Sequence, residues 1–163
     1  MAILEIVKHP SPILSAPCKE VTVFDKELSK LLDDMHETMI KNDGVGIAAP
    51  QVGKSIRAAI VDFDEDQEII EMINPVVTAT GGSEVDVEGC LSFPGLFGEV
   101  ERPFHVRIEA QERDGKLYEL EAEGYEARAI LHEIDHLNGI LFDKKIQRIV
   151  DPSEFEEEEE DDE

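Results

Sequence analysis

The sequence predicts one domain that mixes helices with antiparallel strands. Two segments, 26–41 and 125–137, repeat apolar side chains at the three- and four-residue spacing of an amphipathic helix. Between them lie short apolar runs, some alternating with polar residues, that end at Gly, Pro, Asn or Asp. A chain of 163 residues, 41% of them hydrophobic, is long enough to bury one core.

The N-terminal part of the chain is expected to be irregular up to residue 24. Pro10, Pro12 and Pro17 each interrupt a helix. Asp25 is the expected N-cap of the first helix, whose apolar stripe packs on the core while its charged side faces solvent. A turn at residues 42–44 ends this helix.

Residues 44–53 have small side chains, apart from Val45, Ile47, Val52 and the amide of Gln51. Small residues allow a second backbone or a ligand to approach closely. A phosphate-binding loop is not expected, because no Lys-Ser or Lys-Thr pair follows the glycines. A tightly packed strand in which Gln51 has no function is the alternative.

The middle of the chain contains the predicted strands. Asn74-Pro75 is expected to end one strand, and Asp114-Gly115 to form the turn of a hairpin. Residues 88–95 are expected to form a loop that carries Cys90, followed by a strand that starts at Val100. The predicted strands are 57–63, 69–73, 76–80, 105–111 and 116–122, with a polar turn at 64–67.

The second helix carries the sequence His-Glu-Ile-Asp-His at 132–136. Residues four apart lie on one face of a helix, so His132 and His136 can bind one metal ion. A carboxylate beside the metal, here Glu133, can take a proton from a water molecule. This pattern also arises by chance on charged surface helices, so two solvated histidines are the alternative.

Cys90 has two interpretations when it is taken alone. A thiol in a loop is either a small buried apolar group or a thiolate ligand. With two histidines available on the second helix, a metal ligand is the preferred interpretation. The other cysteine, Cys18, lies far away in sequence, and the pattern is typical of a reducing compartment.

The charge balance restricts the partners of the chain. The sequence has 39 acidic and 15 basic residues, a net charge of −24, with ten acids in residues 151–163. Such a chain repels phosphate backbones and anionic lipids, so neither nucleic-acid nor membrane binding is expected. Residues 148–163 are expected to form a disordered acidic tail or a frayed helix. The N-terminal residues lack the features of a signal peptide, so we expect a cytoplasmic protein.

Three segments, 44–53, 88–95 and 132–139, resemble the three signature motifs of bacterial peptide deformylases, in the same order and at similar spacing. The resemblance covers about residues 3–147. It implies an α+β fold in which antiparallel β-sheets surround a central helix that carries the His-Glu-x-x-His motif, with an N-terminal amphipathic helix. Residues 1–147 would form the catalytic domain.

The resemblance also implies the metal site. Cys90, His132 and His136 would hold one divalent ion, expected to be Fe(II), which Zn(II), Ni(II) or Co(II) can replace. Three protein ligands leave one position for water, as hydrolysis requires. Leu131 departs from the family, which often has Gln before the first histidine ligand, and residues 93–97 are unusually aromatic.

The implied reaction is hydrolysis of the N-formyl group of formyl-methionyl nascent chains, with release of formate. Glu133 would move a proton from the attacking water to the leaving amine, while the Gln51 side chain and the Leu91 backbone N–H bind the oxyanion. The backbone of the substrate would pair with the strand edge at Gly46. The family pattern places the methionine pocket at Val45, Leu91, Tyr125, Ala129 and His132, with Glu88 and Arg102 as a supporting ion pair.

Two other functions remain as alternatives. A zinc endopeptidase with the same motif needs a third ligand, usually downstream of His136, where the chain offers only acids. A catalytically silent deformylase-like binding protein is the second alternative. Family members associate transiently with the ribosome through an extension that is usually basic, and the acidic tail here opposes such contact with RNA. The chain is expected to be a monomer.

Overall fold

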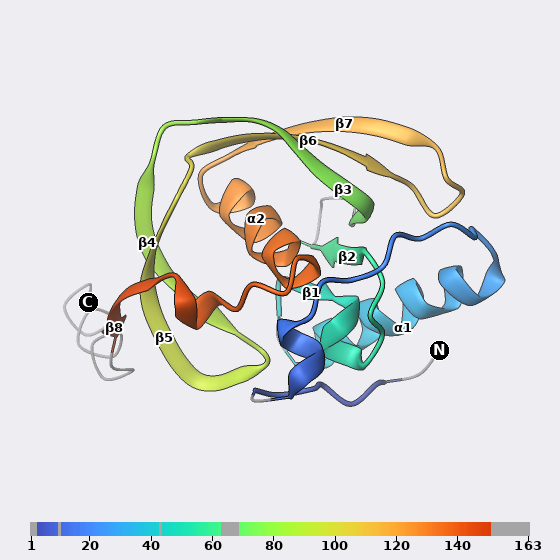
Figure 1. The fold of residues 1–163 in the computed structure, drawn as a ribbon, viewed down its shortest axis with the longest axis horizontal. Helices are drawn as coiled ribbons and strands as arrows, with labels where there is room; N and C mark the ends of the chain where they lie inside the picture. Colours follow the sequence, from blue (N-terminus) through green and yellow to red (C-terminus); the bar gives the residue numbers. More distant parts are fainter. Residues whose placement is uncertain (1–2, 10, 43, 63–68, 151–163) are drawn as a thin grey trace, which may run out of the picture.

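The structure is a computed structural model that describes residues 3–9, 11–42, 44–62 and 69–150. Within these residues, two antiparallel sheets and two α-helices make up most of the regular structure, and α2 lies in the middle (Figure 1). The mixed α+β architecture with antiparallel sheets is therefore confirmed. The elements are η1 (Pro12–Ser15), α1 (Lys26–Lys41), β1 (Gly46–Ala48), η2 (Ala49–Val52), β2 (Ala58–Val61), β3 (Ile70–Gly81), β4 (Glu84–Cys90), β5 (Phe93–Arg102), β6 (His105–Gln111), β7 (Leu117–Glu123), α2 (Tyr125–Leu137), η3 (Phe142–Lys144) and β8 (Ile146–Val150).

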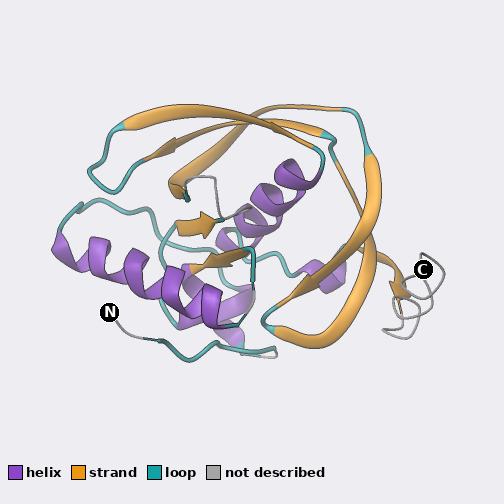
Figure 2. Cartoon of the chain, turned by 180° about the vertical axis from the view of Figure 1, so that it is seen from behind, coloured by secondary structure: helices purple, strands orange, loops and turns teal. Residues whose placement is uncertain are grey.

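The N-terminal segment is less irregular than its prolines predict. It contains the short 3-10 helix η1, which has Pro12 at its start, where the fixed φ of proline suits a helix. Helix α1 follows, and the Asp25 carboxylate caps it by accepting a 3.1 Å hydrogen bond from the Leu28 N–H. The apolar stripe of α1 packs against β1 and β2, and the helix lies on the outside of the molecule (Figure 2).

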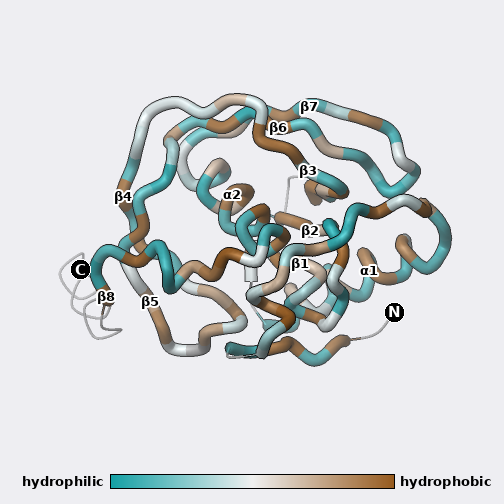
Figure 3. The backbone as a smooth tube through the Cα atoms, viewed as in Figure 1, coloured by the Kyte–Doolittle hydropathy of each residue, from teal (hydrophilic) through white to brown (hydrophobic). Residues whose placement is uncertain are grey.

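The larger sheet has the strand order β1-β2-β3-β6-β7, so β1 and β7 are its edges. Strands β6 and β7 form a hairpin whose turn has Gly115 at φ 91°, a conformation that glycine adopts without strain. Along β6, the buried residues Val106 and Ile108 alternate with the exposed Arg107 and Glu109. The tube of β6 in Figure 3 correspondingly changes between hydrophobic and hydrophilic colours. The apolar face of this sheet and the apolar residues of α2 form one core cluster.

The prediction of two strands around Asn74-Pro75 is wrong, because β3 is continuous through both residues. Its first part pairs with β2 and its second with β6, and the register shifts between Ile73 and Val76. Asn74 adopts a positive φ of 51°, and its amide hydrogen-bonds to the backbone of Val21. The irregularity thus accommodates a proline, which has no N–H to donate to the ladder.

The prediction of a loop at residues 88–95 is also wrong. Strands β4 and β5 form a hairpin that belongs to a second sheet, of order β4-β5-β8, and Cys90 is the last residue of β4. Strand β5 starts at Phe93 rather than at Val100. Gly89 lies opposite Phe97, and a Cβ atom there would come within 2.8 Å of the Phe97 ring. A glycine that suggested a loop is therefore needed for packing inside a strand.

Strand β8 (Ile146–Val150) crosses the domain boundary predicted at residue 147. Strand β8 runs to Val150, which pairs with Phe97 of β5, because the apolar Ile146 and Val150 pack on the hairpin. The predicted turn at 64–67 and residues 151–163 of the predicted tail lie outside the described residues. Among the helices described, each is too short or too polar to cross a membrane.

Candidate metal centre and active site

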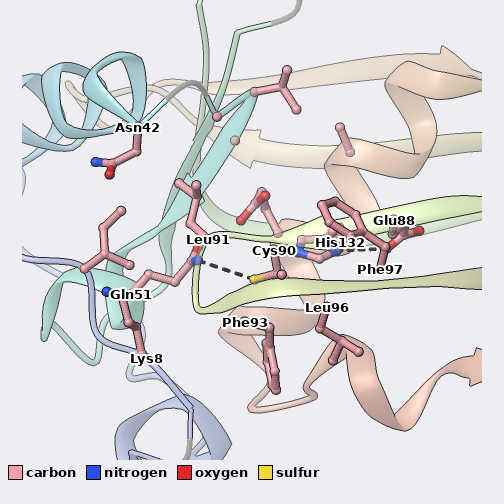
Figure 4. Close-up of a pocket in the computed structure, with 18 of the residues that line it drawn as sticks. Lys8, Asn42, Gln51, Glu88, Cys90, Leu91, Phe93, Leu96, Phe97 and His132 are labelled. Carbon is pink, nitrogen blue, oxygen red and sulfur yellow. Dashed lines mark hydrogen bonds and ion pairs between the residues drawn. The ribbon is translucent and has the colours of Figure 1, made fainter. Parts of the chain in front are cut away.

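Three side chains that could hold a metal ion meet between α2 and the tip of the β4–β5 hairpin. The ligand atoms of Cys90, His132 and His136 all lie within 4.8 Å of one another, and Cys90 Sγ is 3.3 Å from His136 Nε2. Both histidines lie on one face of α2, one turn apart, with ring centroids separated by 5.0 Å. Both histidines are buried, and Figure 4 shows the Cys90 thiol directed towards the Gln51 side chain.

The donor set fits a late first-row divalent ion. One thiolate and two imidazoles suit Fe(II), Zn(II), Co(II) or Ni(II), and three protein ligands leave a position open. The Nδ1 atom of His132 lies 2.9 Å from Glu88 Oε1, so this carboxylate can hold the ring with Nε2 free for a metal. Within the described residues, Nδ1 of His136 has no hydrogen-bond partner, although it is buried.

Glu133 brings a buried carboxyl group to the same place. Its Oε1 atom has no hydrogen-bond partner among the described residues, and burial raises the pKa of Glu133 to about 7. The carboxyl group packs against Gly46 of β1, since a Cβ atom on Gly46 would lie 2.5 Å from Glu133 Oε2. A carboxyl group with this pKa can exchange a proton with a reactant near neutral pH.

Gln51 is buried in η2 with its amide in a defined orientation. Its Oε1 atom accepts a 2.9 Å hydrogen bond from the Ala48 N–H, so the amide nitrogen points the other way. The Nε2 atom donates to Ser92 Oγ at 3.2 Å and approaches Cys90 Sγ at 3.6 Å (Figure 4). An N–H donor is thereby held next to the three candidate metal ligands.

Gln51, Cys90, His132 and Glu133 line one cavity of about 940 Å³. The cavity brings together the residues that the family pattern assigns to substrate: Val45, Gly46, Leu91, Tyr125 and Ala129. The N-terminal segment also lines it, which the sequence did not indicate. Val7 donates its N–H to the Gln51 carbonyl at 2.6 Å and accepts a hydrogen bond from Ser92 Oγ at 2.6 Å. Such long-range pairing leaves no signal in the local sequence.

A buried charged network supports His132. Arg102 bonds Glu88 through Nε at 2.5 Å and Nη2 at 2.9 Å, and it also bonds Asp135 at 2.9 Å. Burial alone would raise the pKa of Glu88, but its hydrogen bonds with His132 and Arg102 outweigh burial and lower the pKa to about 2. Arg128 joins the network at 2.7 Å from Glu88. Arg128 was not predicted as a site residue from the sequence, although it lies four residues before His132 on the same face of α2.

A donor set of two histidines and one cysteine, joined to a buried carboxyl group in a large cavity, defines a metallohydrolase. Comparison with known proteins gives the family. The family model for polypeptide deformylase matches residues 3–151. Peptide deformylase 1 of Bacillus cereus is 57% identical, over 96% of this chain and 100% of its own length. Peptide deformylase 1 of Bacillus subtilis is 49% identical, over 91% of this chain and 92% of its own length.

The solved structures that resemble this chain are also peptide deformylases. A crystal structure of peptide deformylase from Thermotoga maritima superposes with a TM-score of 0.87 at 41% identity, covering 90% of this chain and 99% of that one. A peptide deformylase structure from Legionella pneumophila also gives 0.87, at 39% identity and with 90% and 87% coverage. The chain belongs to the polypeptide deformylase family. It is therefore an enzyme of the deformylase class and not an endopeptidase.

Proposed function

We propose that this enzyme hydrolyses the N-formyl group of formyl-methionyl nascent chains, using one divalent ion held by Cys90, His132 and His136. The observation that carries the proposal is that these three ligands lie together beside the carboxyl group of Glu133, at the wall of one cavity. Oε1 of this carboxyl group has no hydrogen-bond partner among the described residues. Fe(II) is the proposed ion, with Zn(II), Ni(II) and Co(II) as substitutes, because a mixed nitrogen and sulfur donor set accepts all four.

Glu133 is the proposed general acid and base. The metal, when bound, supplies Lewis-acid chemistry that polarises the formyl carbonyl and makes water more acidic. Glu133 then takes a proton from the attacking water at its unpartnered Oε1 and delivers it to the leaving amine. Burial supports this role, since a pKa near 7 allows the carboxyl group both to accept and to donate the proton.

Gln51 and the Leu91 N–H are the proposed oxyanion donors. The Ala48 N–H holds the Gln51 amide, so its N–H group needs little reorganisation when negative charge develops on the formyl oxygen. Leu91 lies at the tip of the hairpin, directly after the ligand Cys90, and it lines the same cavity. Removal of one such donor typically costs about 10²–10³ in kcat.

The edge strand β1 is the proposed docking site for the substrate backbone. Within the part of the chain that the structure describes, β1 pairs with β2 alone, and its residue Gly46 lines the cavity. An extended peptide can add to such an edge through main-chain hydrogen bonds. The methionine side chain would then enter between Val45, Tyr125 and Ala129, which line the cavity with apolar atoms.

The proposed substrate also suggests where the enzyme works. Formylated nascent chains arise in the cytoplasm, where we place the enzyme as a monomer. Any association with the ribosome would be transient, because ten acidic residues at 151–163 oppose contact with RNA. A stable complex with ribosomal RNA is not part of the proposal.

The direct test is formate release from formyl-Met-Ala-Ser by anaerobically prepared, iron-loaded protein. Formate should appear in step with the free amino terminus of Met-Ala-Ser, and acetyl-Met-Ala-Ser should release nothing. Metal content is measured in the same sample. Protein that holds one ion per chain but releases no formate would be a catalytically silent binding protein, and the proposal would be lost.

A further inference from the structure

Arg128 is a buried cation for which the proposed reaction has no direct use. It lies on α2 with 4% of its surface exposed, although it also lines the cavity. Its Nη1 atom donates to Glu88 Oε2 at 2.7 Å and to the Val100 carbonyl at 2.8 Å, and its Nη2 atom donates to the Glu84 carbonyl at 2.8 Å. One side chain thus ties the helix to both strands of the β4–β5 hairpin.

The contact with Glu88 completes the surroundings of that carboxylate. An ionised carboxylate has about four positions that accept hydrogen bonds. Arg102 takes one on each oxygen, His132 takes a second on Oε1, and Arg128 takes a second on Oε2. Glu88 is therefore held from every side, and its Oε1 is left aligned with Nδ1 of His132.

Arg102 alone cannot be expected to hold Glu88 in this orientation. Its guanidinium is shared with Asp135, which Lys145 also contacts at 3.1 Å. If Arg128 were removed, a buried oxygen of Glu88 would lose a donor, and rotation of the carboxylate would weaken the bond to His132.

The hairpin provides acceptors for the rest of the Arg128 guanidinium. Pairing between β5 and β8 shifts register between Glu99 and Val100, and a bulge of this kind leaves backbone groups outside the ladder. The Val100 carbonyl accepts from Arg128 at this point. Glu84 begins the edge strand β4, so its carbonyl is also available. The position of Arg128 is thus set by backbone atoms that do not move with Glu88.

We propose that Arg128 is a positioning residue for the metal ligand His132 and acts through Glu88. Arg128 anchors the Glu88 carboxylate, Glu88 holds the Nδ1–H of His132, and Nε2 of His132 is left in place for the metal. The inference rests on the proposed metal centre but not on the deformylase reaction. Partners of this kind typically change metal affinity by about 10–100-fold when they are removed.

The test is a titration of metal-free protein with Co(II), which reports binding through its absorption bands and needs no turnover. Arg128→Met should weaken Co(II) binding by about 10–100-fold and shift the absorption bands, because His132 is no longer held. Arg107→Met is the matched control. Arg107 also pairs with a glutamate, Glu119 at 2.8 Å, but on the exposed face of β6, so Co(II) binding should be unchanged.

A double-mutant cycle with Glu88→Gln tests whether Arg128 acts through Glu88. The double variant should bind Co(II) no more weakly than Glu88→Gln alone. Wild-type affinity in folded Arg128→Met, or losses that simply multiply in the double variant, would overturn the proposal. If circular dichroism shows that Arg128→Met does not fold, Arg128→Gln, which keeps an N–H donor group, is used in its place. Wild-type Co(II) affinity of Arg128→Gln would equally overturn the proposal.

The outcomes separate this inference from the proposed function. Wild-type protein that binds Co(II) in an Arg128-dependent way but releases no formate would retain the inference and lose the deformylase proposal. Formate release by Arg128→Met at saturating metal, with unchanged Co(II) affinity, would retain the deformylase proposal and lose the inference about Arg128.

Discussion

The two sides of the proposed metal centre differ in charge and in free space. The charged side consists of Glu88, Arg102, Arg128 and Asp135, which are linked by ion pairs between α2 and the hairpin. The neutral side consists of Gly46, Ala48 and Gln51, with small side chains, an amide and an edge of β1 that pairs with no other described strand. The charged side is closed to further partners, whereas the neutral side offers both space and hydrogen-bond donors.

The difference indicates that one side holds the metal ligands and the other side binds the substrate. Metal ligands need rigid surroundings. A buried carboxylate provides them when each of its acceptor positions receives a hydrogen bond. A substrate needs room and unused backbone groups, which β1 and Gln51 provide. We therefore expect substitutions on the charged side to act on metal affinity, and substitutions on the neutral side to act on turnover at full metal occupancy.

The largest effect is expected for Cys90→Ala, which removes the proposed ligand contributed by the hairpin. Two histidines alone bind a divalent ion weakly, so both metal content and formate release should be lost. Metal analysis after gel filtration measures this. Cys18→Ala is the control, since Cys18 is not a member of the ligand group and should keep a full complement of metal. Undiminished metal in Cys90→Ala would remove Cys90 from the coordination sphere.

Glu133→Ala is expected to lower kcat by about 10³-fold or more, because it removes the proposed proton carrier. Glu133 is not among the three ligands, so one ion per chain should remain. Formate release and metal content measured on one preparation separate the two effects. A variant that turns over at more than a tenth of the wild-type rate would exclude the assigned role.

Gln51→Leu is expected to lower kcat by about 10²–10³-fold, with little change in KM, because it deletes a donor that acts in the transition state. Ser92→Ala provides a comparison. It removes a contact of the Gln51 amide but leaves the 2.9 Å bond from Ala48, so the loss should be smaller. A rise in KM at constant kcat would indicate ground-state binding instead.

Gly46→Ala should have the smallest effect, about tenfold in kcat, because the new methyl group must displace the end of a flexible side chain. The crowded group is Glu133, whose Oε2 would lie 2.5 Å from the added Cβ. Gly81→Ala is the control, since its Cβ would approach nothing closer than 4.0 Å. Equal kcat values for the two variants would show that Glu133 has room to move.

The parts of the site that the sequence predicted are those carried by local spacing. His132, Glu133 and His136 lie within five residues of one helix, and residues 44–53 and 88–95 form compact motifs. The β4–β5 hairpin was not predicted, because Gly89 and Pro94 suggest a loop. Only the pairing of β4 with β5 shows why residue 89 is a glycine. Such contacts between distant residues leave no periodic pattern.

Two further features depended on tertiary structure. Strand β3 continues through Pro75 because a register shift and the Asn74 side chain accommodate the proline. Arg128 resembles any helical arginine in the sequence, and only its burial beside Glu88 reveals a connection to the metal centre. Propensity indicates neither feature, since both arise from packing.

The division between the two sides is tested most directly by the Co(II) dissociation constants of Glu88→Gln and Gly46→Ala, measured side by side by absorption. Glu88→Gln should bind Co(II) about 10–100-fold more weakly than the wild type, because His132 loses its carboxylate partner. Gly46→Ala should bind with wild-type affinity. Equal affinities for the two variants, or weaker binding by Gly46→Ala, would contradict the assignment of metal binding to the charged side.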